Sequence, residues 1–123
     1  GLDITKRELQ SELKSKGLPW ERAKAFDGSA LFGRFSPIDD IQDTLGIELS
    51  INGKRVQSGQ VEQMLFKPDH LLAHLAGFMT LNKGDIIMTG TPEGVGTIHA
   101  GDLFFGRIFD RDKTIATAEW QAC

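Results

Sequence analysis

The sequence has a single cysteine, Cys123, and it has neither a long apolar run nor an excess of basic residues. One cysteine cannot form an internal disulfide, and low cysteine usage favours a reducing compartment, so we expect a cytoplasmic protein. No apolar stretch approaches the roughly 18 residues of a transmembrane helix, and no signal-peptide pattern is recognised, so no membrane partner is expected. A net charge of −3 without a basic stripe argues against nucleic acid as a partner.

The length and composition are those of a globular protein. The 123 residues, 40% apolar and 25% charged, fit one domain or a piece of one. A chain of this length can bury roughly 65% of its unfolded surface. The apolar start "GLDIT", without a Met, is typical of the interior of a strand, so we expect the chain to be the C-terminal part of a longer protein. A glycine left from a tag is the alternative.

The N-terminal third predicts helical structure followed by an extended segment. Residues 4–16 carry a weak apolar stripe, Thr5 and Glu8 resemble a capping box, and Gly17 is a natural C-cap. A further helical turn is expected after Pro19. The segment 29–35 is predicted to be extended and half-buried.

The remainder predicts strands with one helix between them. Residues 47–59 alternate apolar and polar around Asn52-Gly53, which predicts an antiparallel hairpin with a type I′ turn and one wet face. We expect further strands at 85–88, 102–110 and 114–120. The helix 69–79 is expected to bury Leu71, Leu72, Leu75 and Phe78. This order favours an α+β fold with a mostly antiparallel or mixed sheet.

The stretch after the predicted strand 85–88 is rich in glycine and threonine. Gly90 allows backbone conformations that other residues disfavour. Thr91 offers a hydroxyl group, and the following Pro92 holds its backbone extended. Exposed N–H groups in such a loop can bind an anion, although the loop is neither a Walker loop nor a dinucleotide fingerprint. The alternative, which residue types alone favour, is a plain tight connection between strands.

Three polar residues cluster near the start of the chain. Asp3 precedes the predicted helix and is either a helix N-cap or an oxygen ligand for Mg²⁺ or Ca²⁺. Arg7 and Gln10 follow on one face of the helix and could reach the same pocket, although a solvated face is the commoner arrangement.

Two further positions could carry chemistry. Lys24 lies in a small apolar patch and is either a desolvated catalytic lysine or one that extends to solvent. His70 and His74 have the i, i+4 spacing of a zinc site, but there is no third ligand and no HExxH pattern, so we expect no zinc there. No Ser-His-Asp or Cys-His nucleophile arrangement is visible.

Taken together, these segments resemble the fumarylacetoacetate hydrolase family. The matching stretches are "LDITKRELQ", "KGLPWERAKAFD", "ELSINGKRVQSG", "GFMTLNKGDIIMTGTPEGVG" and "GDLFF", in family order over nearly the whole chain. The resemblance implies a mainly β, α+β fold: a mixed, sandwich-like β-roll with short peripheral helices, incomplete at its N-terminus, and usually a homodimer. Residues 1–123 would be the C-terminal part of one catalytic domain.

The resemblance also implies roles for single residues. Asp3 matches a ligand of Mg²⁺ or Mn²⁺. Lys24 and Arg7 match catalytic positions, and Gln10, Gly90 and Thr91 match positions that bind the substrate. The implied reaction is metal-dependent hydrolysis of a C–C bond in a small anionic diketo or β-keto acid, through a metal-stabilised enolate. Isomerisation or decarboxylation within the same family, or an inactive dimerisation or binding module, are the alternatives.

The sequence departs from the family pattern in two ways. The helix reads Arg7-Glu8 where an Arg-Asp pair is usual. The family's other two metal carboxylates and its water-activating His and Glu have no counterpart, since the acidic residues at positions 39, 40 and 43 match a variable surface loop. One carboxylate cannot replace three, so the 123 residues by themselves are expected to be inactive.

Overall fold

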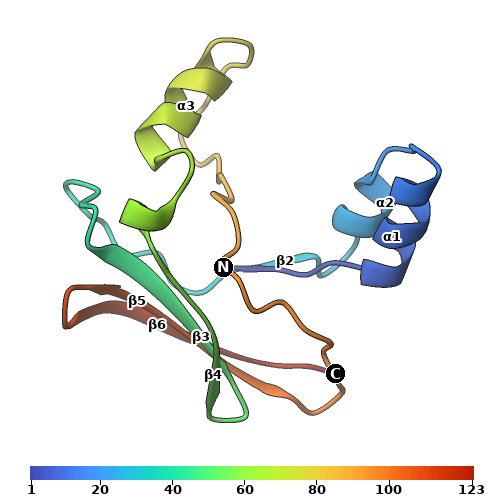
Figure 1. The fold of residues 1–123 in the computed structure, drawn as a ribbon. Coiled ribbons are helices and arrows are strands. Elements are labelled where there is room, and N and C mark those ends of the chain that lie inside the picture. Colours follow the sequence, from blue (N-terminus) through green and yellow to red (C-terminus); the bar gives the residue numbers. More distant parts are fainter. The chain divides into compact units, whose positions relative to one another are not determined.

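The computed structural model describes residues 1–123, which form two compact units, Gly1–Gly33 and Arg34–Cys123. Figure 1 colours both units along the chain from blue to red. The chain folds into a mixture of strands and short helices, so the predicted α+β, mainly β class is confirmed. None of its helices has the length and apolar character of a membrane span.

The N-terminal unit consists of two short strands and two helices. β1 (Leu2–Asp3) pairs antiparallel with β2 (Ala30–Leu31), so only two residues of the predicted extended segment 29–35 form a strand. Between these strands in the chain come α1 (Arg7–Ser15) and α2 (Glu21–Lys24). Leu13 from α1 and Ala23 from α2 are the buried residues of this unit.

The predicted first helix is present but begins later than expected. α1 starts at Arg7 rather than at residue 4, and its N-cap, Lys6, makes no side-chain capping hydrogen bond. The predicted capping box of Thr5 and Glu8 is therefore wrong. The reason is that the Thr5 hydroxyl accepts a hydrogen bond from Lys24 instead.

The end of α1 follows the prediction. Gly17 has φ of +63°, which is the left-handed conformation that glycine adopts without a steric penalty. Its N–H donates to the Lys14 carbonyl at 3.1 Å, and the Leu18 N–H donates to the Leu13 carbonyl at 2.9 Å. This pair of bonds is a Schellman motif, so Gly17 ends the helix and satisfies two of its last carbonyls.

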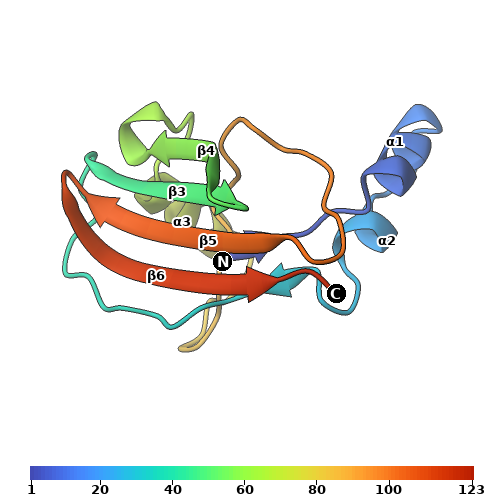
Figure 2. The same cartoon turned by 90° about the horizontal axis from the view of Figure 1, so that it is seen from below.

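The C-terminal unit is built on one antiparallel sheet. The strand order is β4-β3-β5-β6, and Figure 2 shows the four strands as one curved layer. The elements in chain order are β3 (Leu45–Ile51), β4 (Lys54–Gln60), the 3₁₀ turn η1 (Val61–Gln63), α3 (Pro68–Ala76), β5 (Leu103–Asp110) and β6 (Lys113–Gln121).

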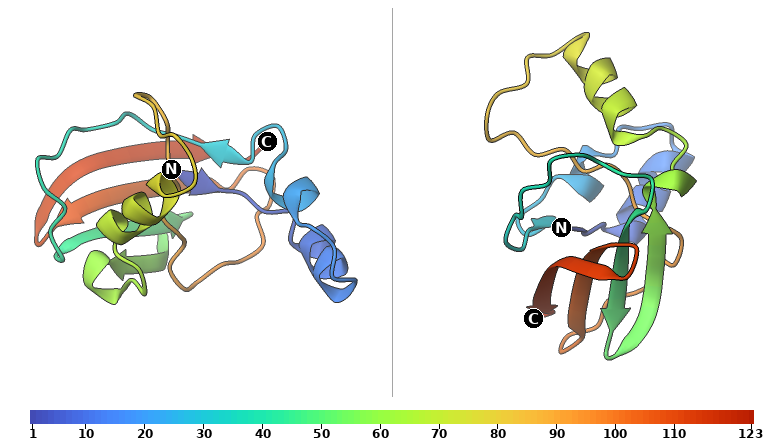
Figure 3. Two further views of the ribbon diagram at one scale, coloured as in Figure 1. Left: turned by 90° about the horizontal axis from the view of Figure 1, so that it is seen from above. Right: turned by 90° about the vertical axis from the view of Figure 1, so that its left-hand side faces the viewer.

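The predicted hairpin and two of the predicted strands of this sheet are confirmed. In the β3–β4 turn, Asn52 and Gly53 have φ of 52° and 78°, as a type I′ turn requires. The strands expected at 102–110 and 114–120 are β5 and β6. Figure 3 shows these two hairpins, coloured green and orange to red, twisting together as one sheet.

The two faces of the sheet differ in polarity. On the wet face, Glu48 accepts hydrogen bonds from Arg55 at 3.1 Å and Arg107 at 3.3 Å. On the apolar face, Phe104 lies opposite Ile51 and is buried. Ile47, which the alternation places on that apolar face, is 42% exposed, because this sheet is a single layer and only parts of it are covered.

The predicted strand 85–88 is absent. Residues 85–88 adopt no regular structure, and Ile86 and Met88 are both exposed. An apolar run becomes a strand only where its backbone groups pair with a neighbouring strand. The four strands of the sheet pair only with one another, so this run has no such partner.

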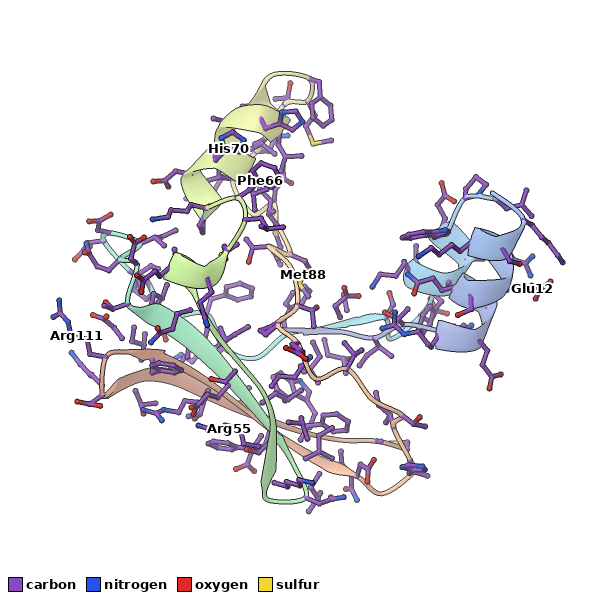
Figure 4. The ribbon with its side chains drawn as sticks, in the orientation of Figure 1. Glu12, Arg55, Phe66, His70, Met88 and Arg111 are labelled. Carbon is purple, nitrogen blue, oxygen red and sulfur yellow. The ribbon has the colours of Figure 1, made fainter.

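The predicted helix 69–79 is present as α3, but its buried side is not. None of its residues is buried; Leu71 and Leu75 are half-buried, whereas Leu72 and Phe78 are exposed. At its start the Phe66 and His70 rings stack with centroids 5.2 Å apart, and Figure 4 labels both side chains. The prediction of a helix was correct, but the expected burial of Leu72 and Phe78 was wrong.

Candidate active site

Asp3 and Lys24 form an ion pair in the N-terminal unit. The Lys24 Nζ lies 2.5 Å from Asp3 Oδ1. The side chains are 34% and 32% exposed, so neither is fully solvated and neither is buried. The residues are twenty-one positions apart in the chain, and the fold brings them together.

Backbone hydrogen bonds determine this approach. β1 places Asp3 opposite Ala30 of β2. The next two bonds continue toward α2, since the Ile4 N–H donates to the Ser29 carbonyl at 2.7 Å and the Lys6 N–H donates to the Ala23 carbonyl at 3.0 Å. The segment that carries Asp3 is therefore fixed against the helix that carries Lys24.

Thr5 completes the surroundings of the Lys24 ammonium group. Lys24 Nζ donates to the Thr5 hydroxyl at 2.8 Å, in addition to Asp3. A lysine ammonium has three N–H donors, so one is left for a further acceptor. Asp3 is thus not an N-cap and Lys24 does not extend freely into solvent. The sequence had suggested Thr5 only as a capping residue; its position two residues after Asp3 is the signal that could have indicated this contact.

Arg7 and Gln10 lie together on α1. Arg7 Nη1 donates to Gln10 Oε1 at 2.7 Å, as their spacing of three residues on one helix face allows. Arg7 is exposed and Gln10 is half-buried. The structure therefore brings these two predicted residues together on an accessible face.

An open apolar hollow adjoins Lys24 in the same unit. Its lining is mainly apolar, with Trp20 45% exposed and Leu18 48% exposed. The full lining is Leu18, Pro19, Trp20, Glu21, Lys24 and Ala25. A ligand resting there would meet an aromatic ring and a cation side by side.

Gly90 and Thr91 lie in the C-terminal unit, in the long connection between α3 and β5. Gly90 has φ of +117°, which only glycine adopts readily, and Thr91 is exposed. The segment immediately after Thr91 lies against β4, since Gln57 Nε2 donates to the Pro92 carbonyl at 3.1 Å.

The other end of this connection is fixed by Asp102. Its carboxylate accepts hydrogen bonds from the His99 backbone N–H and from the Asn52 amide, both at 2.8 Å. The His99 N–H first, and then Asn52, hold the pKa of Asp102 below its usual range. His99 begins a turn, since its carbonyl accepts from the Asp102 N–H at 3.1 Å.

Residues 1–123 do not contain a complete binding site for a divalent metal ion. No group of three or more His, Cys, Asp or Glu side chains is arranged to hold a metal ion. Asp3 offers one carboxylate, which is engaged with Lys24. In the acidic segment 39–43, two carboxylates already have other partners. Asp43 forms an ion pair with Lys67 at 2.6 Å, and Asp40 accepts a hydrogen bond from Gln42.

We therefore expect no Mg²⁺-dependent rise in the Tm of the isolated 123-residue chain. A single carboxylate binds Mg²⁺ too weakly to shift the unfolding equilibrium. Thermal unfolding with and without Mg²⁺, against NaCl of matched ionic strength, measures this. A ligand at one hundred times its Kd stabilises by about 2.7 kcal/mol, and a shift of that size would contradict the expectation.

Comparison with known proteins identifies the family. A sequence profile described as Fumarylacetoacetate (FAA) hydrolase C-terminal matches residues 1–118. The chain belongs to the fumarylacetoacetate hydrolase family. Its sequence is 43% identical over 105 residues to the protein named oxaloacetate tautomerase YcgM of Escherichia coli (strain K12). It is 42% identical over 103 residues to oxaloacetate tautomerase FAHD1, mitochondrial, of Bos taurus.

Solved structures of the family have the same fold. A fumarylpyruvate hydrolase from Pseudomonas aeruginosa, in complex with Mn²⁺ and pyruvate, is similar with a TM-score of 0.87 and 32% identity. The similarity covers 98% of this chain and 51% of that one. A putative fumarylacetoacetate isomerase/hydrolase from Oleispira antarctica has a TM-score of 0.86 and 36% identity, covering 98% and 56% of the two chains.

The chain spans about half the length of the curated relatives it matches. The matches cover 82% of this chain but only 48% of the Escherichia coli protein and 47% of the bovine one. The activity of a whole family member is therefore a proposal for this protein, and so are its metal and its substrate.

Proposed function

We propose that this protein acts on a small β-keto acid of the oxaloacetate type and interconverts its keto and enol forms or removes CO₂ from it. The observation that carries this function is the Lys24 ammonium group, held by Asp3 and Thr5 with one donor left for a substrate oxygen. Support comes from relatives named oxaloacetate tautomerase and, in Dictyostelium discoideum, oxaloacetate decarboxylase. The sequence had placed C–C bond hydrolysis first.

The chemistry needs a cation where negative charge develops. Removing a proton, or CO₂, from the carbon beside a ketone leaves an enolate whose charge lies largely on oxygen. A fixed ammonium group stabilises that oxygen more than the neutral ketone, which lowers the barrier. Lys24 keeps its position during the reaction, because Asp3 and Thr5 already orient it.

Asp3 supplies one ligand to a divalent metal in this proposal, and further ligands have to come from outside these 123 residues. Bound Mg²⁺ or Mn²⁺ would polarise the keto oxygen as a Lewis acid. The family member solved with Mn²⁺ and pyruvate supports a divalent ion.

The anionic substrate also needs groups that bind its carboxylates. Arg7, with Gln10 hydrogen-bonded to it, offers a cation on an accessible helix face. Thr91, beside Gly90, offers a hydroxyl and neighbouring backbone N–H groups. We assign Arg7 to the catalytic residues, and Gln10, Gly90 and Thr91 to substrate binding.

Hydrolysis of an acylpyruvate is the second candidate. The open hollow beside Lys24, lined by Leu18, Pro19 and Trp20, offers apolar contact that oxaloacetate does not use. The similar structure named fumarylpyruvate hydrolase supports this candidate.

We also propose that the protein is a homodimer and that it is located in the cytoplasm. Some relatives have names that place them in mitochondria.

Product analysis with the natural protein distinguishes the candidates. Oxaloacetate and acetylpyruvate are each incubated with Mg²⁺ and followed by NMR. Enol–keto conversion of oxaloacetate, or pyruvate with CO₂ from it, is expected. Pyruvate and acetate from acetylpyruvate would instead favour the hydrolase. Absence of turnover with both substrates would contradict the proposed function.

Thr91→Val is expected to raise KM about 3- to 10-fold with little change in kcat, since it removes one hydrogen bond worth about 1 kcal/mol. Steady-state kinetics with oxaloacetate measure this. Thr80→Val is the matched control, because Thr80 is exposed and in the same connection between α3 and β5. An unchanged KM in Thr91→Val would remove Thr91 from the binding site.

A further inference from the structure

We propose that three residues, Gln57 and Gly59 of β4 and Gly94 of the loop, are positioning residues that fix Thr91. The inference rests on the proposed function, because it concerns how Thr91 meets a substrate. Thr91 itself is exposed. Its direction therefore depends on what holds the residues that follow it.

The first contact is a hydrogen bond from the sheet. Gln57 is half-buried in β4, and its Nε2 donates to the carbonyl of Pro92 at 3.1 Å. A carbonyl can only accept, so the amide has to present its NH₂ group. Pro92 also restricts the backbone of the residue before it, so a fixed Pro92 limits the conformations of Thr91 directly.

The second contact depends on the missing side chain of Gly59. A Cβ added at Gly59 would lie 3.0 Å from Cγ and 3.2 Å from Cβ of Pro92. Gly59 and Gln57 are two residues apart on one strand, so they face the same side of the sheet. The Pro92 ring thus rests on Gly59 while its carbonyl is held by Gln57.

The third contact is a close approach of two backbones. Gly94 has φ of +109°, and a Cβ added there would lie 1.9 Å from the Val56 carbonyl oxygen. Only glycine allows the loop to lie this close to β4. Figure 2 shows the loop leaving from beside β4 before it turns toward β5.

These contacts converge on residues 92–94, directly after Thr91, and come from Val56, Gln57 and Gly59 of one sheet strand. A strand in a hydrogen-bonded sheet is more rigid than a connection without regular structure. We infer that β4 transmits this rigidity to Thr91, so that its hydroxyl points in one direction before the substrate arrives. Such preorganisation improves binding by lowering the ordering cost.

A double-mutant cycle on the natural protein tests the inference. Gln57→Leu keeps the volume but removes the donor, and KM for oxaloacetate is expected to rise about 3- to 10-fold with kcat nearly unchanged. If Gln57 acts through Thr91, adding Gln57→Leu to Thr91→Val raises KM no further. Tm is measured for each variant to confirm folding, and Gly59→Ala serves as a second variant if Gln57→Leu does not fold.

The outcomes separate this inference from the proposed function. If Thr91→Val raises KM and Gln57→Leu does not, or if the two effects add, the positioning role is wrong and the function stands. If Thr91→Val leaves KM unchanged while oxaloacetate is turned over, Thr91 does not bind the substrate, and the positioning role proposed for its neighbours is wrong as well. Absence of turnover in the wild type overturns both.

A glycine pair supplies a control for backbone strain. Gly94 and Gly84 have similar φ values, 109° and 102°, but an added Cβ at Gly84 would meet nothing within 4 Å. Gly84→Ala introduces the strain without the clash on β4. We expect Gly94→Ala to raise KM and Gly84→Ala to leave it unchanged; equal effects would contradict a role for the contact with Val56.

Discussion

Lys24→Met in the natural protein is expected to lower kcat about 10²- to 10³-fold, with KM changed only a few-fold. Methionine keeps an unbranched stem of similar length and removes the charge and the donors. The loss falls on kcat because the ammonium group stabilises the enolate oxygen, which carries its charge only as the reaction proceeds. Steady-state kinetics with oxaloacetate and saturating Mn²⁺ measure both constants.

Lys16→Met is the matched control. Lys16 also makes an ion pair, with Glu12 at 2.6 Å, but both side chains are 58% exposed on the surface of α1. Exposed pairs of this kind contribute little to stability, so the control variant should behave as wild type. If Lys24→Met changed KM alone, Lys24 would be a binding residue and not a catalytic one.

Asp3→Asn is expected to abolish metal-dependent turnover. An amide is a weaker ligand than a carboxylate for Mg²⁺ or Mn²⁺, and a site with few ligands tolerates no such loss. The same change also removes the negative charge that pairs with Lys24. Mn²⁺ binding is therefore measured directly, by titration of the variant and the wild type, beside activity.

The two measurements assign the role of Asp3. Weakened Mn²⁺ binding together with lost activity is the expected result. Unchanged Mn²⁺ binding with lost activity would mean that Asp3 only orients Lys24, and wild-type activity would refute both roles. Asp43→Asn is the control, since Asp43 pairs with Lys67 at a similar distance of 2.6 Å on an exposed surface.

The strands of the sheet and the β3–β4 hairpin were predictable from local patterns, whereas the pairing of β3 with β5 was not predicted. The Asn52-Gly53 turn determines the β3–β4 hairpin through backbone conformation alone, and the alternation in β5 and β6 determines which side chains share a face. Gly17 ended α1 for the same local reason. Each of these features depends on residues within a few positions of one another.

The wrong predictions concern features that depend on residues far apart in the chain. Residues 85–88 have the apolar character of a strand but no neighbouring strand in the sheet, and Phe78 has the spacing of a buried residue but is 66% exposed. Local patterns give the tendency of a segment, whereas pairing and burial depend on the rest of the structure.

The candidate site was predictable only in part. Asp3 and Lys24 were separate possibilities in the sequence, each with a structural alternative, and their ion pair follows from the pairing of β1 with β2. The support of the Pro92 segment by Gln57 and Gly59 had no local signal, because β4 lies more than thirty residues earlier in the chain.

The most direct test of the proposed chemistry is exchange of the methyl protons of pyruvate in D₂O, followed by ¹H NMR with the natural protein and Mg²⁺. Tautomerisation, decarboxylation and hydrolysis share an enolate, and exchange reports it without the later steps. We expect metal-dependent loss of the methyl signal, abolished in Lys24→Met and retained in Lys16→Met. Absence of exchange above the buffer rate in the wild type, or equal exchange in Lys24→Met, would contradict enolate stabilisation by Lys24.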